Sequence, residues 1–479
     1  MITIHVEKGD SMSSNTEFLK KLTDIVGNGA IMTDSGEMEP YSHDESATEE
    51  FNTMPAAVVR PESTEQVASV VAACAVEGIQ VTPRGGGTGL AGGCIPASGG
   101  IVLSLERLNS RIDVDPENMS VTADAGVSLE QLYHAVEEEN LFFPPHPGDE
   151  SAMLGGVIAA NAGGARAVKY GTVKQFVRGL TVVTAEGKVL KLGGNLLKSS
   201  TGYHLLDLMI GSEGTLGIIT SVTLSLLPKP GITETLVIPF ETVDEAISSV
   251  LPIFKLGIIP FAVEFIEHTT IRCVERLLEK SWPVQSGTAS LLVILDGPDE
   301  EQVLATAEKI GEELENCGAQ DILLAEQREK QSDILEMRSM IYEALRPGVG
   351  ELYDVCVPRS EITGHVHFIH ELEDTYGVPL PTIGHAADGN LHSHAMKYRL
   401  EDGELKEPIA DFEEKNKKLE EEIFADVYKR GGVISGEHGI GVIKKNHLTA
   451  NLGEDTVAVM RAVKQALDPK GILNPGKLF

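Results

Sequence analysis

Two histidines and a later Glu-His pair are the residues of this sequence whose types and spacing best suit metal chemistry. His385 and His392 flank the string Ala-Ala-Asp-Gly-Asn-Leu, and Glu437 and His438 follow in Gly-Glu-His-Gly. Two neutral imidazoles and one carboxylate are a normal ligand set for a catalytic divalent ion that keeps one position open. A strand over Gly-Asn-Leu-His-Ser-His would place His392 and His394 on the same face. Histidine pairs also occur in structural or exposed settings, so the residues alone leave both interpretations open.

A glycine-rich stretch over residues 84–93 is the second candidate for ligand binding. Its letters R-G-G-G-T-G-L-A-G-G contain Gly87-x-Gly89-x-x-Gly92, a pattern typical of dinucleotide-binding turns. That interpretation requires a helix directly after the glycines. The next letters, C-I-P-A-S-G-G with Pro96, do not fit a helix interior and lead into the strand-like I-V-L-S-L. The sequence therefore predicts a glycine loop between two strands, whose backbone N–H groups form an anion site.

Composition limits the class of protein. The chain has 479 residues and a mass of 51.3 kDa, which predicts two or three domains. Its 72 acidic and 39 basic residues give a formal charge of -33, which argues against nucleic-acid binding because phosphate contacts need clustered Lys and Arg. The N-terminal letters lack the apolar core of a signal peptide, and no apolar run is long enough to span a membrane. We therefore expect a cytoplasmic protein.

The cysteines offer no site for an electron carrier. Their spacing contains no C-x-x-C motif, which excludes an iron–sulfur cluster or a structural zinc site built on thiolates. If this chain moves electrons, it needs another carrier and a partner that receives them. The five cysteines are Cys74, Cys94, Cys273, Cys317 and Cys356.

Changes in composition divide the chain into four segments. Residues 1–54 are predicted to form a helical lead-in with an acidic loop, and residues 55–230 are rich in glycine, short strands and short helices. Residues 231–428 alternate apolar strands with longer amphipathic helices, which predicts an α+β domain with an antiparallel sheet and helices on one face. Residues 429–479 become glycine-rich again, and we expect them to pack back on the first domain. The longer helices are predicted near residues 243–256, 299–316 and 328–345.

Seven strings in a fixed order carry a resemblance to a known family. They are P-R-G-G-G-T-G-L-A-G-G, H-P-G-D, L-G-G-V-I-A-A-N-A-G-G, G-S-E-G-T-L-G-I-I-T, G-H-A-A-D-G-N-L-H, S-G-E-H-G-I-G and D-P-K-G-I-L-N-P-G-K-L-F. With them the chain resembles the FAD-linked oxidoreductases of the vanillyl-alcohol oxidase type, in the branch of D-lactate dehydrogenase, the FAD-linked subunit of glycolate oxidase, and D-2-hydroxyglutarate dehydrogenase. The resemblance implies an α+β protein with a PCMH-type FAD-binding domain and a ferredoxin-like substrate domain. The substrate domain is expected to contain an antiparallel sheet. The C-terminal segment is expected to complete the active site.

The resemblance also implies that the glycine-rich strings bind FAD. Glycines without a Cβ let the backbone approach a diphosphate closely, and successive N–H groups donate to it. Relatives that attach FAD covalently often carry a histidine where this chain has Thr88, so we predict non-covalent FAD. The residues expected to contact FAD are Pro83, Arg84, Gly85, Gly86, Gly87, Thr88, Gly89, Leu90, Pro147, Gly148, Gly155, Gly156, Asn161, Gly163, Gly164, Gly171, Glu213, Gly217, Ile218 and Asn474.

The same resemblance gives the metal candidates their roles. It implies that His385, His392 and Glu437 bind a divalent metal, which we expect to be Zn, Fe or Mn. It places His438 beside the substrate hydroxyl, as the catalytic base. Relatives commonly have glycine where this chain has Ala387, a difference that matters only if the position needs a positive φ.

Three further residues are expected to contact the substrate. Arg338 matches the family's arginine on a helix of the second domain, and a planar guanidinium can hold a carboxylate bidentately. Tyr342 lies one turn later, and Asn390 is the third expected contact. Relatives that oxidise dicarboxylates carry a lysine shortly before the Y-D string, where this chain has Leu352. The loss of that second cation predicts a small monocarboxylic hydroxy acid as the substrate.

The expected reaction is oxidation of D-lactate or glycolate to the 2-oxo acid, with hydride transfer to flavin N5. Electrons would then pass to an electron-transfer flavoprotein, an iron–sulfur subunit or a quinone, in a homodimer or a hetero-complex. D-2-hydroxyglutarate is the alternative substrate. Two other classes of function are an ether-lipid synthase, whose histidine-rich run this chain lacks, and a non-catalytic flavoprotein subunit, against which the intact His and Glu residues argue.

Overall fold

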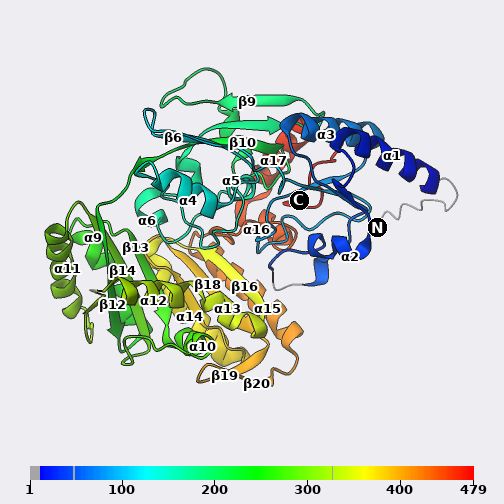
Figure 1. Cartoon of the computed structure of the whole chain (residues 1–479). Helices are drawn as coiled ribbons and strands as arrows, with labels where there is room; N and C mark the ends of the chain where they lie inside the picture. The colour runs from blue at the N-terminus through cyan, green and yellow to red at the C-terminus, as the bar shows by residue number, and fades with distance from the viewer. Residues whose placement is uncertain (1–10, 47–48, 326) are drawn as a thin grey trace.

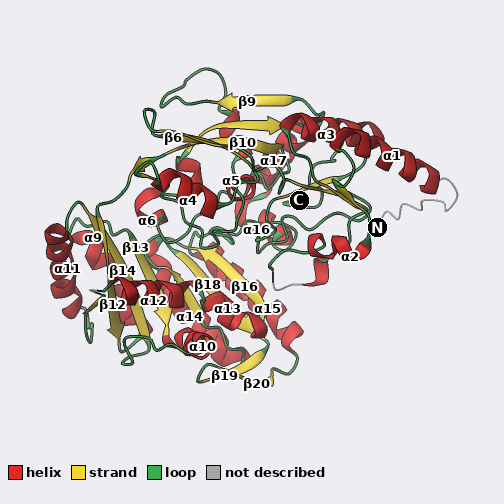
Figure 2. Ribbon diagram, in the orientation of Figure 1, coloured by secondary structure: helices red, strands yellow, loops and turns green. Residues whose placement is uncertain are grey.

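The computed structural model describes residues 11–46, 49–325 and 327–479. Residues 1–10 and 47–48 of the predicted N-terminal lead-in therefore lie outside the described residues. The chain forms two bodies, one from its first half and its C-terminal segment, the other from the region between (Figure 1). Figure 2 shows that both bodies combine sheets with helices. Within the described ranges, no helix is both long enough and apolar enough to span a bilayer.

The first body contains two sheets that share one apolar core. The smaller sheet has the strand order β1 (Ile31–Met32), β2 (Ala57–Val59), β4 (Ile101–Ser104) and β3 (Val81–Arg84). The larger has the order β5 (Ile112–Asp115), β6 (Ser120–Asp124), β10 (Ile218–Ser225), β8 (Val177–Val183) and β9 (Val189–Gly193), and β7 (Leu141–Phe142) pairs with β11 (Leu227–Pro228). The helices are α1 (Ser11–Val26), α2 (Ser35–Met38), α3 (Thr64–Glu77), α4 (Leu129–Glu137), α5 (Leu154–Ala159), α6 (Ala167–Tyr170) and α7 (Leu205–Met209).

The glycine stretch connects two parallel strands without a helix. β3 pairs with β4 in parallel from Val81 opposite Ile101 to Arg84 opposite Ser104. Residues 85–100, between these strands, contain turns and bends but no helical segment. This confirms the predicted strand, glycine loop and strand, and it excludes a Rossmann unit, in which a helix would follow the glycines.

The second body is built on a seven-stranded antiparallel sheet. Its order is β15 (Leu323–Leu324), β12 (Ile232–Phe240), β14 (Ala289–Gly297), β13 (Ala262–Glu267), β17 (Thr382–His385), β18 (Asn390–Met396) and β16 (Val349–Cys356). A separate hairpin pairs β19 (Tyr398–Glu401) with β20 (Glu404–Pro408). The predicted antiparallel sheet is therefore confirmed.

Helices cover both faces of this sheet, so the prediction of helices on one face was wrong. Alternate residues of β14, such as Leu291 and Leu292, enter two different apolar clusters. The strands are apolar on both sides, and each side has to be shielded from water. One face carries α8 (Val243–Ser248), α9 (Val250–Lys255), α11 (Glu300–Glu315), α14 (Ile362–Tyr376) and α15 (Phe412–Lys429). The other carries α10 (His268–Leu278), α12 (Arg328–Ser339) and α13 (Ile341–Leu345).

The C-terminal segment returns to the first body. After α15 the chain forms α16 (Lys445–Leu452) and α17 (Glu454–Leu467), drawn in red among the N-terminal elements in Figure 1. The backbone N–H of Val81 donates to the carbonyl of Ile472, and the N–H of Asn474 donates to the carbonyl of Val81. The last residues thus extend the edge of β3, as expected, and the loop before α16 lies between the two bodies.

Candidate active site

Two adjoining cavities lie where the two bodies meet. One, of about 270 Å³, is lined mainly by the glycine stretch and nearby loops of the first body, and we call it the glycine-loop cavity. The other, of about 800 Å³, lies against the sheet of the second body, and we call it the interdomain cavity. Their shared wall consists of Thr88, Leu90, Pro147, Asp149, Glu437 and His438. A molecule in the first cavity would therefore reach the Glu-His pair.

Most residues predicted to contact FAD line one of these cavities. The glycine-loop cavity is lined by Pro83, Arg84, Gly85, Gly86, Gly87, Thr88, Gly89, Leu90, Pro147, Gly155, Gly156, Glu213, Gly217 and Ile218. Gly148 and Gly164 line the interdomain cavity. The first cavity is thus a concave surface with little side-chain bulk, which suits a bound dinucleotide.

Four of the predicted contacts do not line either cavity. Asn161 accepts hydrogen bonds from Thr172 and from a backbone N–H, and Gly171 ends α6 with a positive φ. Gly163 packs against the Glu437 carboxylate. Asn474 donates through Nδ2 to the carbonyls of Gly93 and Glu213, which ties the C-terminal segment to two of the cavity loops. Of these four residues, Gly163 and Asn474 contact residues that line the cavities.

The Arg84 side chain also serves the protein scaffold. Its guanidinium donates to the carbonyls of His43, at 2.6 Å, and Pro40, at 2.9 Å. These bonds tie the N-terminal segment over the glycine stretch. Arg84 thus uses these donors inside the protein, which leaves the backbone N–H groups of this stretch as the candidate donors to a diphosphate.

The close approach of Gly87 to Arg84 yields a first prediction. Gly87 has a φ of +83°, and a Cβ there would lie 2.0 Å from Arg84 Nη2. Gly87→Ala should lower the melting temperature and weaken FAD binding at least about tenfold, because left-handed strain costs about 1–3 kcal/mol and the guanidinium must also move. Fluorescence titration with FAD measures the affinity. Gly99→Ala is the matched control, since Gly99 has a φ of +78° and nothing within 4 Å of its Cβ position. Equal FAD affinity in the two variants would contradict this account of the loop.

The register of the second sheet brings four polar side chains onto one face. Glu264 of β13 stands opposite His385 of β17, and Asp354 of β16 stands opposite His392 of β18. Directly paired residues of antiparallel strands point to the same side. Because β17 and β18 are themselves paired, these residues form a polar row across an otherwise apolar sheet. His394, two residues beyond His392, lines the same cavity, as the strand spacing predicted.

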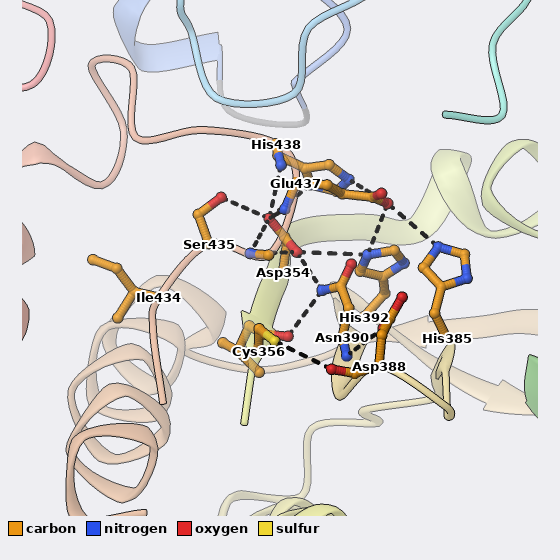
Figure 3. Close-up of polar contacts among 12 residues, drawn as sticks. Asp354, Cys356, His385, Asp388, Asn390, His392, Ile434, Ser435, Glu437 and His438 are labelled. Carbon is orange, nitrogen blue, oxygen red and sulfur yellow. Dashed lines mark hydrogen bonds and ion pairs between the residues drawn. The ribbon is translucent and has the colours of Figure 1, made fainter. Parts of the chain in front are cut away.

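Glu437 brings its carboxylate to the two histidines of this row. Its Oε1 lies 3.5 Å from His385 Nε2 and 3.3 Å from His392 Nε2, as the dashed lines in Figure 3 show. The three donor atoms lie within 4.8 Å of one another. The buried His392 Nε2 and Glu437 Oε2 have no hydrogen-bond partner among the described residues. Such a set of converging, unsatisfied donors fits a divalent cation.

The charges of this group depend on one another. Burial alone would raise the pKa of the Glu437 carboxyl, but its contacts with His385 and His392 hold that pKa well below its usual range. Burial would likewise lower the pKa of His385, but the carboxylates of Glu264 and Glu437 raise it well above its usual range. Glu437 is therefore an anion at neutral pH, which is the state a cation requires.

His438 lies beside this group on the shared cavity wall. Its ring stacks on His392 with centroids 5.1 Å apart, and its Nε2 lies 3.9 Å from Glu437 Oε1. Burial lowers the pKa of the His438 imidazole to about 4, although the charge of Asp354 acts in the opposite direction. The ring is therefore neutral at pH 7 and can accept a proton.

Asp354 holds the Glu-His loop in place, although no sequence motif pointed to it. This carboxylate is completely buried and accepts hydrogen bonds from the backbone N–H groups of Gly436, Glu437 and His438. The Ser435 hydroxyl donates to it at 2.8 Å (Figure 3). Successive N–H groups around one carboxylate form a rigid turn. The positions of the Glu437 and His438 side chains thus depend on Asp354.

Asn390 does not line either cavity, in contrast to its expected contact with substrate. Its side-chain amide donates to Asp354 Oδ1 at 2.7 Å and to the carbonyl of Val355 at 2.9 Å. Both amide hydrogens are therefore used inside the protein. Ala387, the other unusual position of this loop, does not have a positive φ, so its methyl group causes no backbone strain.

Arg338 and Tyr342 both line the interdomain cavity, but each already has a protein partner. Arg338 donates through Nε to Glu264 Oε2 at 2.8 Å and through Nη2 to the same oxygen. Tyr342 donates its hydroxyl to the carbonyl of Glu45 at 3.1 Å. The Nε edge of Arg338 is thus occupied, which leaves its remaining N–H groups for a ligand. Leu352 lines the cavity at the position where the dicarboxylate-specific relatives are expected to carry lysine.

The fold and the glycine-loop cavity agree with comparisons to known proteins. Residues 55–193 match the FAD binding domain family, and residues 229–478 match the family described as FAD linked oxidases, C-terminal domain. The chain therefore belongs to the FAD-linked oxidases and is an FAD-dependent oxidoreductase. p-Cresol methylhydroxylase has the same fold, with a TM-score of 0.77 at 19% identity over 99% of this chain and 98% of that chain.

Two curated relatives are similar over most of their length. A D-lactate dehydrogenase of Archaeoglobus fulgidus is 39% identical over 421 residues, which cover 88% of this chain and 90% of that protein. A glycolate oxidase subunit of Bacillus subtilis is 37% identical over 443 residues, which cover 92% of each. Both similarities extend across the two bodies.

Proposed function

We propose that this protein oxidises a small D-2-hydroxy acid, D-lactate or glycolate, to the corresponding 2-oxo acid. The observation that carries the proposal is the shared wall of the two cavities, where His438 lies beside the group of His385, His392 and Glu437. This arrangement puts a proton acceptor and a cation site next to the cavity that suits a flavin. The names of the two relatives, a D-lactate dehydrogenase and a glycolate oxidase subunit, support the choice of substrate class.

Each residue of the proposed site has a separate role in the reaction. His385, His392 and Glu437 would hold a divalent ion, which when bound supplies positive charge that lowers the pKa of the substrate hydroxyl. The free N–H groups of Arg338 bind the substrate carboxylate and orient C2 toward the glycine-loop cavity. His438 accepts the hydroxyl proton as the C2 hydrogen leaves with its electron pair and the carbonyl forms. Bound FAD supplies the acceptor for that hydride.

The walls of the interdomain cavity favour a substrate with one carboxylate. Leu352 places an apolar side chain where a second carboxylate would need a cation. D-2-hydroxyglutarate is therefore the alternative rather than the preferred substrate.

We also propose that FAD is held without a covalent bond, since Thr88 stands at the attachment position. Acid precipitation should then release the yellow chromophore into the supernatant.

The two electrons need an acceptor outside this chain. We propose a partner protein, either an electron-transfer flavoprotein or an iron–sulfur subunit, or else a quinone. The sequence has no C-x-x-C motif for a cluster of its own. The Glu437 and His438 positions are those of a catalytic subunit, whereas a purely electron-carrying subunit would not need them.

Anaerobic mixing with a panel of hydroxy acids tests this proposal. The flavin absorbance should bleach with D-lactate or glycolate, and L-lactate serves as the matched control because it presents the opposite face of C2. Bleaching by D-2-hydroxyglutarate alone would replace the proposed substrate by its alternative. If no hydroxy acid bleaches the flavin and the purified protein contains no metal, a non-catalytic role is the better account.

A further inference from the structure

One buried carboxylate joins two parts of the site that the sequence places far apart. Glu264 of β13 is 2% exposed and lines the interdomain cavity. Its Oε1 lies 2.6 Å from His385 Nδ1, and its Oε2 accepts hydrogen bonds from Arg338. The cation that would bind the substrate and one of the metal-binding histidines therefore share a single anion. Figure 3 shows the Glu437 carboxylate between His385 and His438.

The contact fixes the orientation of the His385 ring. Because Nδ1–H donates to this carboxylate, Nε2 is the ring nitrogen left to bind a metal ion, which takes the place of the Nε2 proton. In this structure Nε2 is the atom that faces Glu437, at 3.5 Å. An outer carboxylate of this kind holds the tautomer and the ring angle that a metal ligand needs, and it raises the basicity of the ligand. His385 is thus oriented before any ion binds.

The same carboxylate controls the charge near Arg338. Arg338 donates two hydrogen bonds to Glu264 Oε2, and His385 Nδ1 contacts Oε1, so this carboxylate lies directly beside the guanidinium whose charge it balances. Without this anion, a guanidinium and a divalent ion would face each other across a buried space with nothing between them, and like charges repel strongly there. Glu264 therefore lets two positive centres occupy one cavity.

We propose that Glu264 is a positioning residue that couples metal binding to hydroxy-acid binding. It orients His385 for the ion and holds Arg338 at the cavity edge, so that each ligand stabilises the arrangement that the other requires. The coupling is reciprocal, because two ligands that favour the same arrangement raise each other's affinity by the same factor. This inference rests on the proposed function, since it takes the metal and the hydroxy acid from that proposal.

The chain provides a matched control on the same strand. Glu267 is also a buried carboxylate paired with a histidine, since its Oε1 lies 2.8 Å from His370 Nε2 and its Oε2 accepts the Thr382 N–H. It is three residues further along β13 and therefore points to the opposite face of the sheet. Glu267→Gln removes a comparable charge without touching either cavity.

The test measures metal affinity in the FAD-loaded protein after its metal has been removed with a chelator. Mn²⁺ is titrated by calorimetry into the wild type, Glu264→Gln, Glu264→Asp and Glu267→Gln, with and without saturating pyruvate, a 2-oxo product that is not turned over. We expect Glu264→Gln to bind Mn²⁺ about 10–100-fold more weakly than the wild type. Pyruvate should tighten Mn²⁺ binding in the wild type and have little effect in this variant. Glu264→Asp should lie between them, and Glu267→Gln should match the wild type.

Each outcome has a defined meaning. Unchanged Mn²⁺ affinity in Glu264→Gln overturns the inference and leaves the proposed function intact. An equal loss in Glu264→Gln and Glu267→Gln also overturns it, because the effect would then be general destabilisation. Wild-type protein that binds no Mn²⁺ overturns the metal site of the proposed function and this inference with it. The flavin spectrum and the melting temperature, recorded for each variant, show that every protein compared is folded and loaded.

Discussion

Replacing Glu437 by Gln should reduce the rate of flavin reduction by D-lactate at least about 1000-fold. Glu437 supplies the carboxylate of the proposed metal site and contacts both histidines. A neutral amide would leave two imidazoles to hold the ion. The charge that a catalytic ion supplies contributes several kcal/mol to the transition state, and about 4 kcal/mol corresponds to this loss. Anaerobic stopped-flow absorbance gives the rate, and elemental analysis gives the metal content.

The control for this variant is a Glu-His pair outside the linings of the glycine-loop and interdomain cavities. Glu420 Oε1 lies 3.3 Å from His447 Nε2, and neither residue lines either of these two cavities. Glu420→Gln should retain the wild-type rate and metal content. The account is contradicted if Glu437→Gln keeps its metal and reduces its flavin as fast as this control.

Replacing His438 by Gln should slow the same reaction by about 100- to 10,000-fold, the usual contribution of a positioned general base. The metal content and the flavin spectrum should stay unchanged, because the proposed ligands His385, His392 and Glu437 remain. The turn that carries Glu437 should also remain, since Asp354 Oδ2 accepts the backbone N–H of residue 438 at 2.9 Å, whereas Nδ1 of the replaced side chain lies farther from it, at 3.7 Å. Elemental analysis shows whether the metal is retained, and stopped-flow absorbance gives the rate of flavin reduction. The two measurements together distinguish loss of the base from loss of the metal.

His394→Gln is the comparison for the base. His394 lies in the same cavity, but its Nδ1 is 3.0 Å from the carbonyl of Pro381, and burial lowers its pKa to about 3. His394 lies two positions after His392 on β18, and it is not one of the residues that the two cavities share. A larger loss in His394→Gln than in His438→Gln would contradict the assignment of His438 as the proton acceptor.

The parts of the fold that local sequence specifies were predicted well. Pro96 and its neighbouring glycines exclude a helix after the glycine stretch, so the strand pair β3 and β4 followed from residue types alone. The three helical regions predicted in the second body are present, although the first and the third are each divided into two helices, and α10, α14 and α15 were not predicted. The coverage of both sheet faces was missed, although the run Ser-Leu-Leu-Val-Ile-Leu of β14 has no polar alternation and is typical of a strand buried on both sides.

The residues that support the site were harder to predict. Glu264 contacts Arg338, 74 positions away in the sequence, and Asp354 contacts the N–H of His438, 84 positions away. Such partners come together only in the folded chain. A signal was nevertheless present, because each acid interrupts an apolar strand, in Phe-Ala-Val-Glu-Phe-Ile and Leu-Tyr-Asp-Val. A charge in such a position has to be paired when it is buried. The partners themselves could not be read from spacing.

The contacts of Asn390 differ from the expectation for the same reason. It was expected to contact a substrate, but both hydrogens of its side-chain amide donate inside the folded chain, to Asp354 Oδ1 and to the carbonyl of Val355. Hydrogen-bond capacity used inside the protein is not available to a ligand. Arg338 donates to Glu264 through Nε and Nη2, and its remaining N–H groups are those proposed to bind the substrate carboxylate.

The most direct test of the account is an anomalous difference map from crystals of the FAD-bound protein grown with pyruvate and the native metal. We expect one strong peak bonded to Nε2 of His385, Nε2 of His392 and the Glu437 carboxylate, with His438 and the flavin N5 on the same side of the pyruvate. No peak at these three residues, or a flavin whose N5 faces away from them, would contradict it.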